Sequence, residues 1–105
     1  MEKFRFDYSE NSDILHIHKN EKTTKGSVEL GYFTLDFGED KEIIGLEIEH
    51  ASEFLNKSGI NKKSLRTIQY VRFIINKKNP KERLISLNIR LPNSIKKIDV
   101  PLEVA

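Results

Sequence analysis

Apolar side chains recur at every second position along most of this chain, which is the period of a β-strand with one buried face. The first segment alternates Phe4, Phe6 and Tyr8 with charged residues. Three further apolar rows follow one another in the second half of the chain: Val71, Phe73 and Ile75; Ile85, Leu87, Ile89 and Leu91; and Ile98, Val100, Leu102 and Val104. Because the joins between them are too short for crossover helices, we expect the strands to pair in antiparallel order.

The segment from Ser27 to Phe37 changes the face on which its apolar residues lie. They occupy even-numbered positions up to Tyr32 and odd-numbered positions from Phe33 onward. This switch predicts one long strand with a bulge near Gly31, or a strand that is buried on both sides. Residues 44–48 alternate regularly again and predict another strand.

Two short helical segments are expected between the strands. Residues 51–57 predict a helix that Ser52 caps and that ends at Ser58 and Gly59, and Asn61 is placed to cap one further turn through Leu65. The expected fold class is α+β and strand-dominated, with about seven mostly antiparallel strands and one or two short helices near residues 51–66. Pro101 predicts that the last strand lies at a sheet edge or contains a bulge.

The composition narrows the class of protein. The chain has 105 residues, which fits a single domain over residues 1–105, and it has no cysteine, which excludes disulfides, thiolate catalysis and cysteine-based zinc sites. No apolar run approaches the roughly 18 residues of a membrane-spanning helix, and the segment MEKFRFDYSE lacks the apolar core of a signal peptide. We therefore expect a cytoplasmic protein without a membrane partner.

Charge is distributed unevenly along the chain. Residues 1–55 contain 6 Lys/Arg and 13 Asp/Glu, a balance of −7, whereas residues 56–105 contain 12 Lys/Arg and 3 Asp/Glu, a balance of +9. The two halves together give the net charge of +2. Such asymmetry between an acidic half and a basic half indicates an electrostatic partner.

The first half also carries a family pattern. The segments FDYSENSDILHIH, SVELGYFTLDF and KEIIGLEIEHASEFL resemble the family of domain of unknown function 2283 (DUF2283) over roughly residues 6–55. The matching positions are Tyr8, Asp13, Leu15, Ile17, Leu35, Asp36, Gly45, Glu47, Ile48, Ala51, Ser52 and Leu55. His16 departs from the pattern, because an aromatic residue is usual there. The turn at residues 38–41 also departs from the family pattern. The resemblance implies a fold shared with small prokaryotic proteins, some of them encoded beside toxin-like partners, and hence an antitoxin-like binding role.

The basic second half supplies the candidate binding residues. They are cations near the expected second helix and along the expected strands, together with one aromatic residue: Lys62, Lys63, Arg66, Tyr70, Arg72 and Arg90. If the strands bring them to one face, the arginines can follow a phosphate backbone and the tyrosine can stack on a base. Two structural alternatives stay open: lysine-rich hairpin tips that prevent edge aggregation, and self-association of the basic half with the acidic half of another copy.

Two further constellations suggest chemistry. His16 and His18 lie two residues apart on one expected strand, and Asp36 could complete a metal site with them; the alternative is an ordinary solvated face. Asp36, Glu47 and Glu49 could form a pair of catalytic carboxylates, or simply a charged exterior. We expect no catalytic residues and no cofactor. The favoured function is a non-enzymatic binding or interaction module that forms a homodimer, with a further protein partner as an additional expectation. The alternative is a nucleic-acid-binding module that uses the basic half, and a metal-dependent enzyme ranks last.

Overall fold

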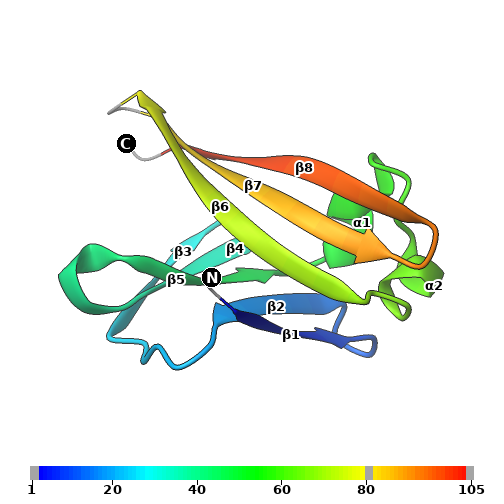
Figure 1. Ribbon diagram of the computed structural model, residues 1–105, viewed down its shortest axis with the longest axis horizontal. Coiled ribbons are helices and arrows are strands. Elements are labelled where there is room, and N and C mark those ends of the chain that lie inside the picture. The colour runs from blue at the N-terminus through cyan, green and yellow to red at the C-terminus, as the bar shows by residue number, and fades with distance from the viewer. Residues whose placement is uncertain (1–2, 80–81, 104–105) are drawn as a thin grey trace. The chain divides into compact units, whose positions relative to one another are not determined.

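The computed structural model describes the backbone of residues 3–79 and 82–103, and side-chain environments within residues 3–75 and 85–100. These residues form eight strands in two antiparallel sheets, with two short α-helices (Figure 1). The chain divides into two compact units, Met1–Arg66 and Thr67–Ala105, each with its own sheet. The prediction of a strand-dominated, antiparallel fold with two short helices is therefore confirmed.

The first unit contains a five-stranded sheet in the order β1-β2-β5-β4-β3. Its strands are β1 (Phe4–Ser9), β2 (Ile14–Lys19), β3 (Gly26–Leu30), β4 (Phe33–Phe37) and β5 (Ile43–Ile48), and a 3-10 turn, η1 (Glu39–Lys41), precedes β5. The central strand β5 pairs Leu46 with Ile17 on one side and with Leu35 on the other, and all three side chains are buried. One face of this sheet is thus the apolar core of the unit, as the two-residue period requires.

The stretch predicted as one bulged strand over residues 27–37 is a hairpin instead. β3 ends at Leu30, β4 begins at Phe33, and the two-residue turn between them has Gly31 at φ +63°. A glycine with positive φ at the first of two turn positions is typical of the tight hairpin turns whose twist matches the strands. The turn moves the apolar residues from even to odd positions, and it also explains why the structure has eight strands rather than about seven.

The two helices follow β5, and the predicted C-terminal end of the first helix and N-cap of the second are both present. α1 (Ala51–Asn56) is closed by Gly59, which has φ +81°, and by backbone hydrogen bonds from Ile60 N to Leu55 O and from Gly59 N to Asn56 O. α2 (Lys62–Leu65) is capped by the Asn61 side chain, which accepts a hydrogen bond from Ser64 N at 2.9 Å.

The second unit is a three-stranded sheet in the order β6-β7-β8. Its strands are β6 (Tyr70–Asn79), β7 (Glu82–Leu91) and β8 (Ser94–Glu103). The three predicted apolar rows lie on one face of this sheet, where Val71, Leu87 and Val100 are fully buried; Val104 lies outside the described residues. β8 is an edge strand, which confirms the position predicted from Pro101.

Candidate functional site

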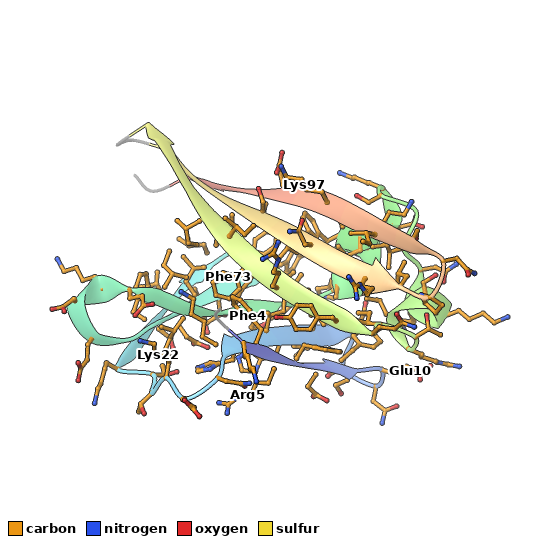
Figure 2. All side chains as sticks on the ribbon, in the orientation of Figure 1. Phe4, Arg5, Glu10, Lys22, Phe73 and Lys97 are labelled. Atoms are coloured by element: carbon orange, nitrogen blue, oxygen red, sulfur yellow. The ribbon has the colours of Figure 1, made fainter. Side chains whose placement is uncertain are left out.

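Cationic side chains gather on the exposed face of the three-stranded sheet. Tyr70 on β6 lies opposite Arg90 on β7, and Arg90 lies opposite Ile95 on β8. In the next exposed row, Arg72 lies opposite Asn88, and Asn88 lies opposite Lys97. Side chains directly opposite each other in an antiparallel pair have Cβ atoms about 5 Å apart, so these residues form one surface. Figure 2 shows Lys97 standing on β8.

We call this surface the cationic face; it is defined by Tyr70, Arg72, Ile74, Arg90, Ile95 and Lys97. Its arginines and its lysine are exposed and Tyr70 is half-buried, while Ile95 is 65% and Ile74 is 39% exposed. In the row that contains Ile74, the buried Ser86 hydroxyl donates a hydrogen bond to Asp99 at 2.9 Å. The face therefore combines positive charge, one aromatic ring and exposed aliphatic side chains.

The structure brings together only some of the predicted binding residues. Tyr70, Arg72 and Arg90 share the cationic face, as the two-residue period implied. Ile74 lies on the same face. Lys97 and Ile95 also belong to it but were not assigned to it from the sequence, although their positions alternate with the buried rows and carried the same signal.

The remaining predicted residues, Lys62, Lys63 and Arg66, belong to the first unit, at α2 and its C-terminal end. Lys62 and Lys63 are exposed, whereas Arg66 forms an ion pair with Glu10, in the turn that follows β1. The hydrogen bond from Arg66 lowers the pKa of the Glu10 carboxyl, and Lys62 adds a smaller electrostatic contribution. The ion pair between Arg66 and Glu10 therefore connects the C-terminal end of α2 to the acidic half of the chain.

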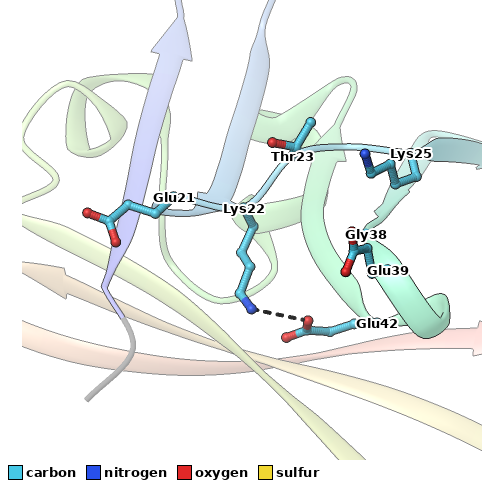
Figure 3. Close-up of a pocket in the computed structure, with 7 residues that line it drawn as sticks. All are labelled: Glu21, Lys22, Thr23, Lys25, Gly38, Glu39 and Glu42. Atoms are coloured by element: carbon cyan, nitrogen blue, oxygen red, sulfur yellow. Dashed lines mark ion pairs between the residues drawn. The ribbon is translucent and has the colours of Figure 1, made fainter.

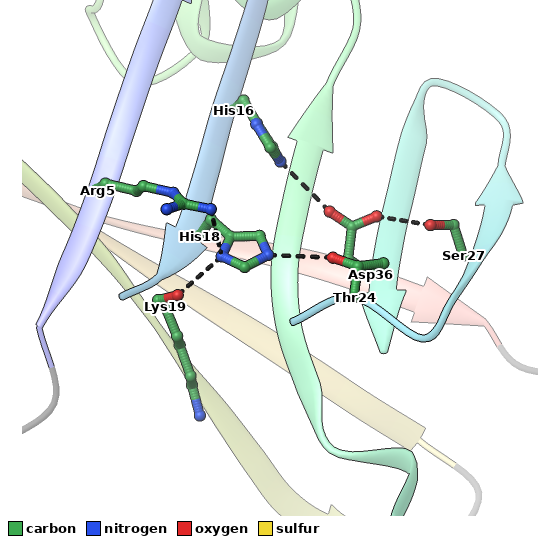
Figure 4. Close-up of polar contacts among 7 residues, drawn as sticks. All are labelled: Arg5, His16, His18, Lys19, Thr24, Ser27 and Asp36. Carbon is green, nitrogen blue, oxygen red and sulfur yellow. Dashed lines mark hydrogen bonds and ion pairs between the residues drawn. The ribbon is translucent and has the colours of Figure 1, made fainter. Parts of the chain in front are cut away.

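The predicted histidine and aspartate residues occupy the polar face of the five-stranded sheet. His16 Nε2 lies 3.3 Å from Asp36 Oδ2, and the Ser27 hydroxyl donates to Asp36 Oδ1 at 2.7 Å (Figure 4). The imidazole rings of His16 and His18 meet edge to face, with centroids 5.8 Å apart. The sequence therefore identified residues that do lie together, on β2 and β4.

His18 is not on a solvated surface, which was the alternative expected for this pair. It is 4% exposed, its Nδ1 lies 2.8 Å from the Lys19 carbonyl oxygen, and its Nε2 lies 3.2 Å from Thr24 Oγ1 (Figure 4). Because a carbonyl can only accept, Nδ1 carries the proton and Nε2 accepts from the Thr24 hydroxyl. Thr24 comes from the loop between β2 and β3, a contact that strand periodicity does not reveal.

In this structure the residues of the predicted metal site form hydrogen bonds with one another and with their neighbours. Both ring nitrogens of His18 have hydrogen-bonding partners, and Asp36 faces Ser27 and His16 with its two oxygens. In the part of the chain that the structure describes, no three His, Cys, Asp or Glu side chains are grouped to hold a metal ion. Glu47 lies opposite His16 and Thr34, and Glu49 follows the end of β5.

Gly45 has no side chain, which allows His18 and Asp36 to approach each other across β5. It lies opposite His18 on one side and Asp36 on the other. A Cβ atom at this position would lie 2.6 Å from Asp36 Oδ2 and 2.9 Å from His18 Cδ2, closer than van der Waals contact permits. The glycine of the family pattern is thus required here by the close approach of two polar side chains.

A second polar cluster surrounds Asp13 at the turn between β1 and β2. Asp13 accepts hydrogen bonds from the Tyr8 hydroxyl at 2.6 Å, from the Ser52 hydroxyl at 2.6 Å and from Ser52 N at 3.1 Å. Ser52 was predicted to cap α1, but His50 holds the N-cap position, and the Ser52 hydroxyl reaches across to Asp13 instead. Residues of the family pattern thus hold α1 against the first hairpin.

One hollow lies beside the loop after β2. Its wall contains Lys22 and Glu42, whose charged groups are 3.6 Å apart (Figure 3). Lys19 also pairs with Glu42, at 3.1 Å. The hydrogen bond from Lys19 lowers the pKa of Glu42. The charges of this hollow thus neutralise one another in part, and none of the predicted site residues lines it. The full lining is Glu21, Lys22, Thr23, Lys25, Gly38, Glu39 and Glu42.

Neither described helix is long and apolar enough to cross a membrane. No solved structure matches the chain. A protein of Methanosarcina mazei with the name "Putative hypoxanthine phosphoribosyltransferase" is 33% identical over 66 residues. That alignment covers 63% of this chain and 51% of the relative, so the chain matches about half of the relative's length. Residues 5–52 match the model of the family described as "Protein of unknown function (DUF2283)", which confirms over that segment the resemblance predicted from the sequence.

Proposed function

We propose that this chain is a non-enzymatic, cytoplasmic binding module that forms a homodimer and contacts an anionic protein partner through the cationic face. The observation that carries the proposal is the grouping of Arg72, Arg90 and Lys97 on one exposed sheet face. Asp99 is the one carboxylate in the described part of that face. Such a field attracts an oppositely charged surface and orients it before contact.

The exposed isoleucines indicate that the partner makes direct contact with the cationic face. Ile95 is 65% and Ile74 is 39% exposed, whereas Val71, Leu87 and Val100 on the other face of the same sheet are fully buried. Arginine, tyrosine and aliphatic residues in one patch are the composition of protein interfaces, where apolar side chains lose water and arginine forms paired hydrogen bonds. The expected partner therefore presents carboxylates around an apolar centre.

The cationic face is a poor surface for pairing with itself. A two-fold contact would bring Arg72, Arg90 and Lys97 of one copy against the same three cations of the other. Like charges held at close range disfavour such a complex. We therefore assign the cationic face to a different molecule and the homodimer to another part of the chain.

The polar cluster on the first sheet supports a structural role rather than hydrolysis. Ser27 donates to Asp36, and Asp36 lies between Ser27 and His16, so the histidine is not in position to take the serine proton. We do not extend phosphoribosyl transfer to this chain either. The five glycines are isolated in the sequence, at 26, 31, 38, 45 and 59, and offer no glycine-rich loop to cradle phosphates.

Single-stranded nucleic acid is a second candidate partner, favoured by the position of Tyr70. The ring lies opposite Arg90 and two residues from Arg72 on the same face, so a stacked base would have a guanidinium on each side. Base stacking on an aromatic side chain contributes about 1–3 kcal/mol per base. This contribution distinguishes nucleic acid from anionic partners that have no bases.

Retention on immobilised heparin tests the cationic face as an anion-binding surface. We expect the variant Arg72→Glu/Arg90→Glu to elute at clearly lower salt than the wild type, because it removes two of the three cations and adds two carboxylates. The matched control Lys25→Glu/Lys57→Glu makes the same change of charge on exposed residues of the first unit. Equal elution of the two double variants would contradict the proposal.

Fluorescence anisotropy with a labelled single-stranded oligonucleotide separates the two candidate partners. If nucleic acid is the partner, Tyr70→Leu weakens oligonucleotide binding about tenfold and leaves heparin retention unchanged, and log affinity falls steeply with log salt. An affinity unaffected by Tyr70→Leu, or one that does not depend on salt, removes the nucleic-acid candidate and leaves the acidic protein surface.

A further inference from the structure

The outer strand β1 carries two opposite charges that find no ion-pair partner within the described chain. β1 pairs only with β2 in the five-stranded sheet, and Arg5 and Asp7 are exposed on its polar face. Figure 2 labels Arg5 on this strand. The Arg5 guanidinium lies 3.5 Å from His18 Nδ1. Phe6 is half-buried between the two charges on the opposite face.

A two-fold axis through this edge would make the strand complementary to itself. Such an axis, perpendicular to the sheet, pairs β1 with β1 of a second copy in antiparallel order and keeps each side chain on its own face. Centred on Phe6, it places Arg5 of each copy opposite Asp7 of the other and Phe6 opposite Phe6. A centre on Arg5 or on Asp7 places two identical charges opposite each other, which destabilises a strand pair.

The other sheet edges are less suited to such pairing. On β3, an axis through Val28 places Glu29 opposite Ser27, and an axis through Ser27 places Glu29 opposite Lys25, which lies outside the strand. On β8, an axis through Ile98 places Lys97 opposite Asp99, but Asp99 already accepts a hydrogen bond from Ser86, and Pro101 in the same strand has no N–H to donate. β6 carries cations and no carboxylate, so pairing with itself would bring like charges together.

We propose that two copies of this chain pair along β1, in antiparallel register about Phe6, with two ion pairs between Arg5 and Asp7. The pairing joins the two five-stranded sheets into one continuous sheet of ten strands. The inference rests on the homodimer proposed above and names its interface. It is independent of the cationic face, which belongs to the second unit.

Charge reversal with a cross-complementation step tests the pairing. We expect Arg5→Asp alone and Asp7→Arg alone each to raise the dissociation constant of the dimer about tenfold or more, because each reversal turns two ion pairs into two repulsions. A mixture of the two single variants should form a heterodimer, and the double variant Arg5→Asp/Asp7→Arg should dimerise like the wild type. Analytical ultracentrifugation over a concentration series gives the masses, and native mass spectrometry identifies the heterodimer.

Controls separate this interface from the homodimer itself. Glu29→Arg, a charge reversal on the opposite edge of the same sheet, should leave the dimer intact. A wild type that is monomeric throughout the series overturns both the homodimer and this interface. A dimer that neither single reversal weakens overturns the β1 interface alone. Circular dichroism shows whether a reversal unfolds the chain. If it does, Arg5→Gln and Asp7→Asn replace the reversals, and we expect a smaller rise in the dissociation constant of the dimer.

Discussion

Asp13 shows how a single side chain connects distant parts of the first unit. Its backbone has φ +56°, its carbonyl accepts from Ala51 N at 3.0 Å, and its carboxylate receives the hydrogen bonds of Tyr8 and Ser52. Burial and the hydrogen bond to Asp13 raise the pKa of the Tyr8 phenol, so it stays a donor well above neutral pH. The residues of the family pattern here hold the fold together.

Asp13 also makes the stability of the chain depend on pH. Burial raises the pKa of its carboxyl, but the hydrogen bonds from Ser52 and Tyr8 outweigh burial and lower it overall. A group whose pKa is lower in the folded state stabilises that state above its unfolded pKa, which is about 4, and loses this contribution as the pH falls through the folded value.

We therefore expect Asp13→Asn to lower the free energy of unfolding by about 1–2 kcal/mol at neutral pH, because the amide cannot accept all three hydrogen bonds. The difference from the wild type should shrink as the pH falls below about 4, because there the unfolded Asp13 carboxyl binds a proton before the folded one does. Urea unfolding at a series of pH values measures both effects, with Glu29→Gln as a neutral control. If the difference in free energy of unfolding stays constant with pH, the charge of Asp13 does not contribute to the stability of the chain.

The hairpin of β3 and β4 shows what local pattern can and cannot reveal about an element. The switch of the apolar residues from even to odd positions near Gly31 is visible in the sequence. Because apolar residues continue on both sides of it, the switch resembles a bulge. Gly31 itself was the missed signal, because two-residue hairpin turns place glycine first when φ is positive.

Two glycines allow this turn to be tested with a matched pair. A Cβ atom at Gly31 or at Gly26 would meet nothing within 4 Å, but only Gly31 has positive φ. Gly31→Ala should therefore destabilise the chain by about 1 kcal/mol through backbone strain alone. Gly26→Ala should have no effect or stabilise slightly. Thermal unfolding of both variants provides the comparison, and equal melting temperatures would exclude strain at the turn.

Local patterns predicted the elements better than they predicted the contacts between them. The end of α1 at Gly59, the cap at Asn61 and the apolar rows of β6 to β8 all follow from neighbouring residues, and all are present. The strand order β1-β2-β5-β4-β3, by contrast, depends on pairings between distant segments. For the same reason, the burial of His18 under Thr24 and the bond from Ser52 to Asp13 could not be read from periodicity.

At the scale of the whole molecule, structure and charge divide the chain at different points. The charge balance changes near residues 55 and 56, whereas the structural units meet between Arg66 and Thr67. Residues 1–66 contain 10 Lys/Arg and 13 Asp/Glu, and residues 67–105 contain 8 and 3. The cations of α2 thus partly offset the acidic unit. The second unit keeps a clear positive excess, and Arg72, Arg90 and Lys97 of that excess lie on the cationic face.

Backbone amide chemical shifts can locate the binding surface without any substitution. We propose to titrate the full-length, ¹⁵N-labelled chain with a heparin-derived oligosaccharide and follow each amide signal. If the cationic face is the contact surface, the largest shifts arise at Tyr70, Arg72, Arg90 and Lys97 and at their strand neighbours. Shifts concentrated at Lys62 and Lys63, or spread evenly over all exposed lysines, would contradict that assignment.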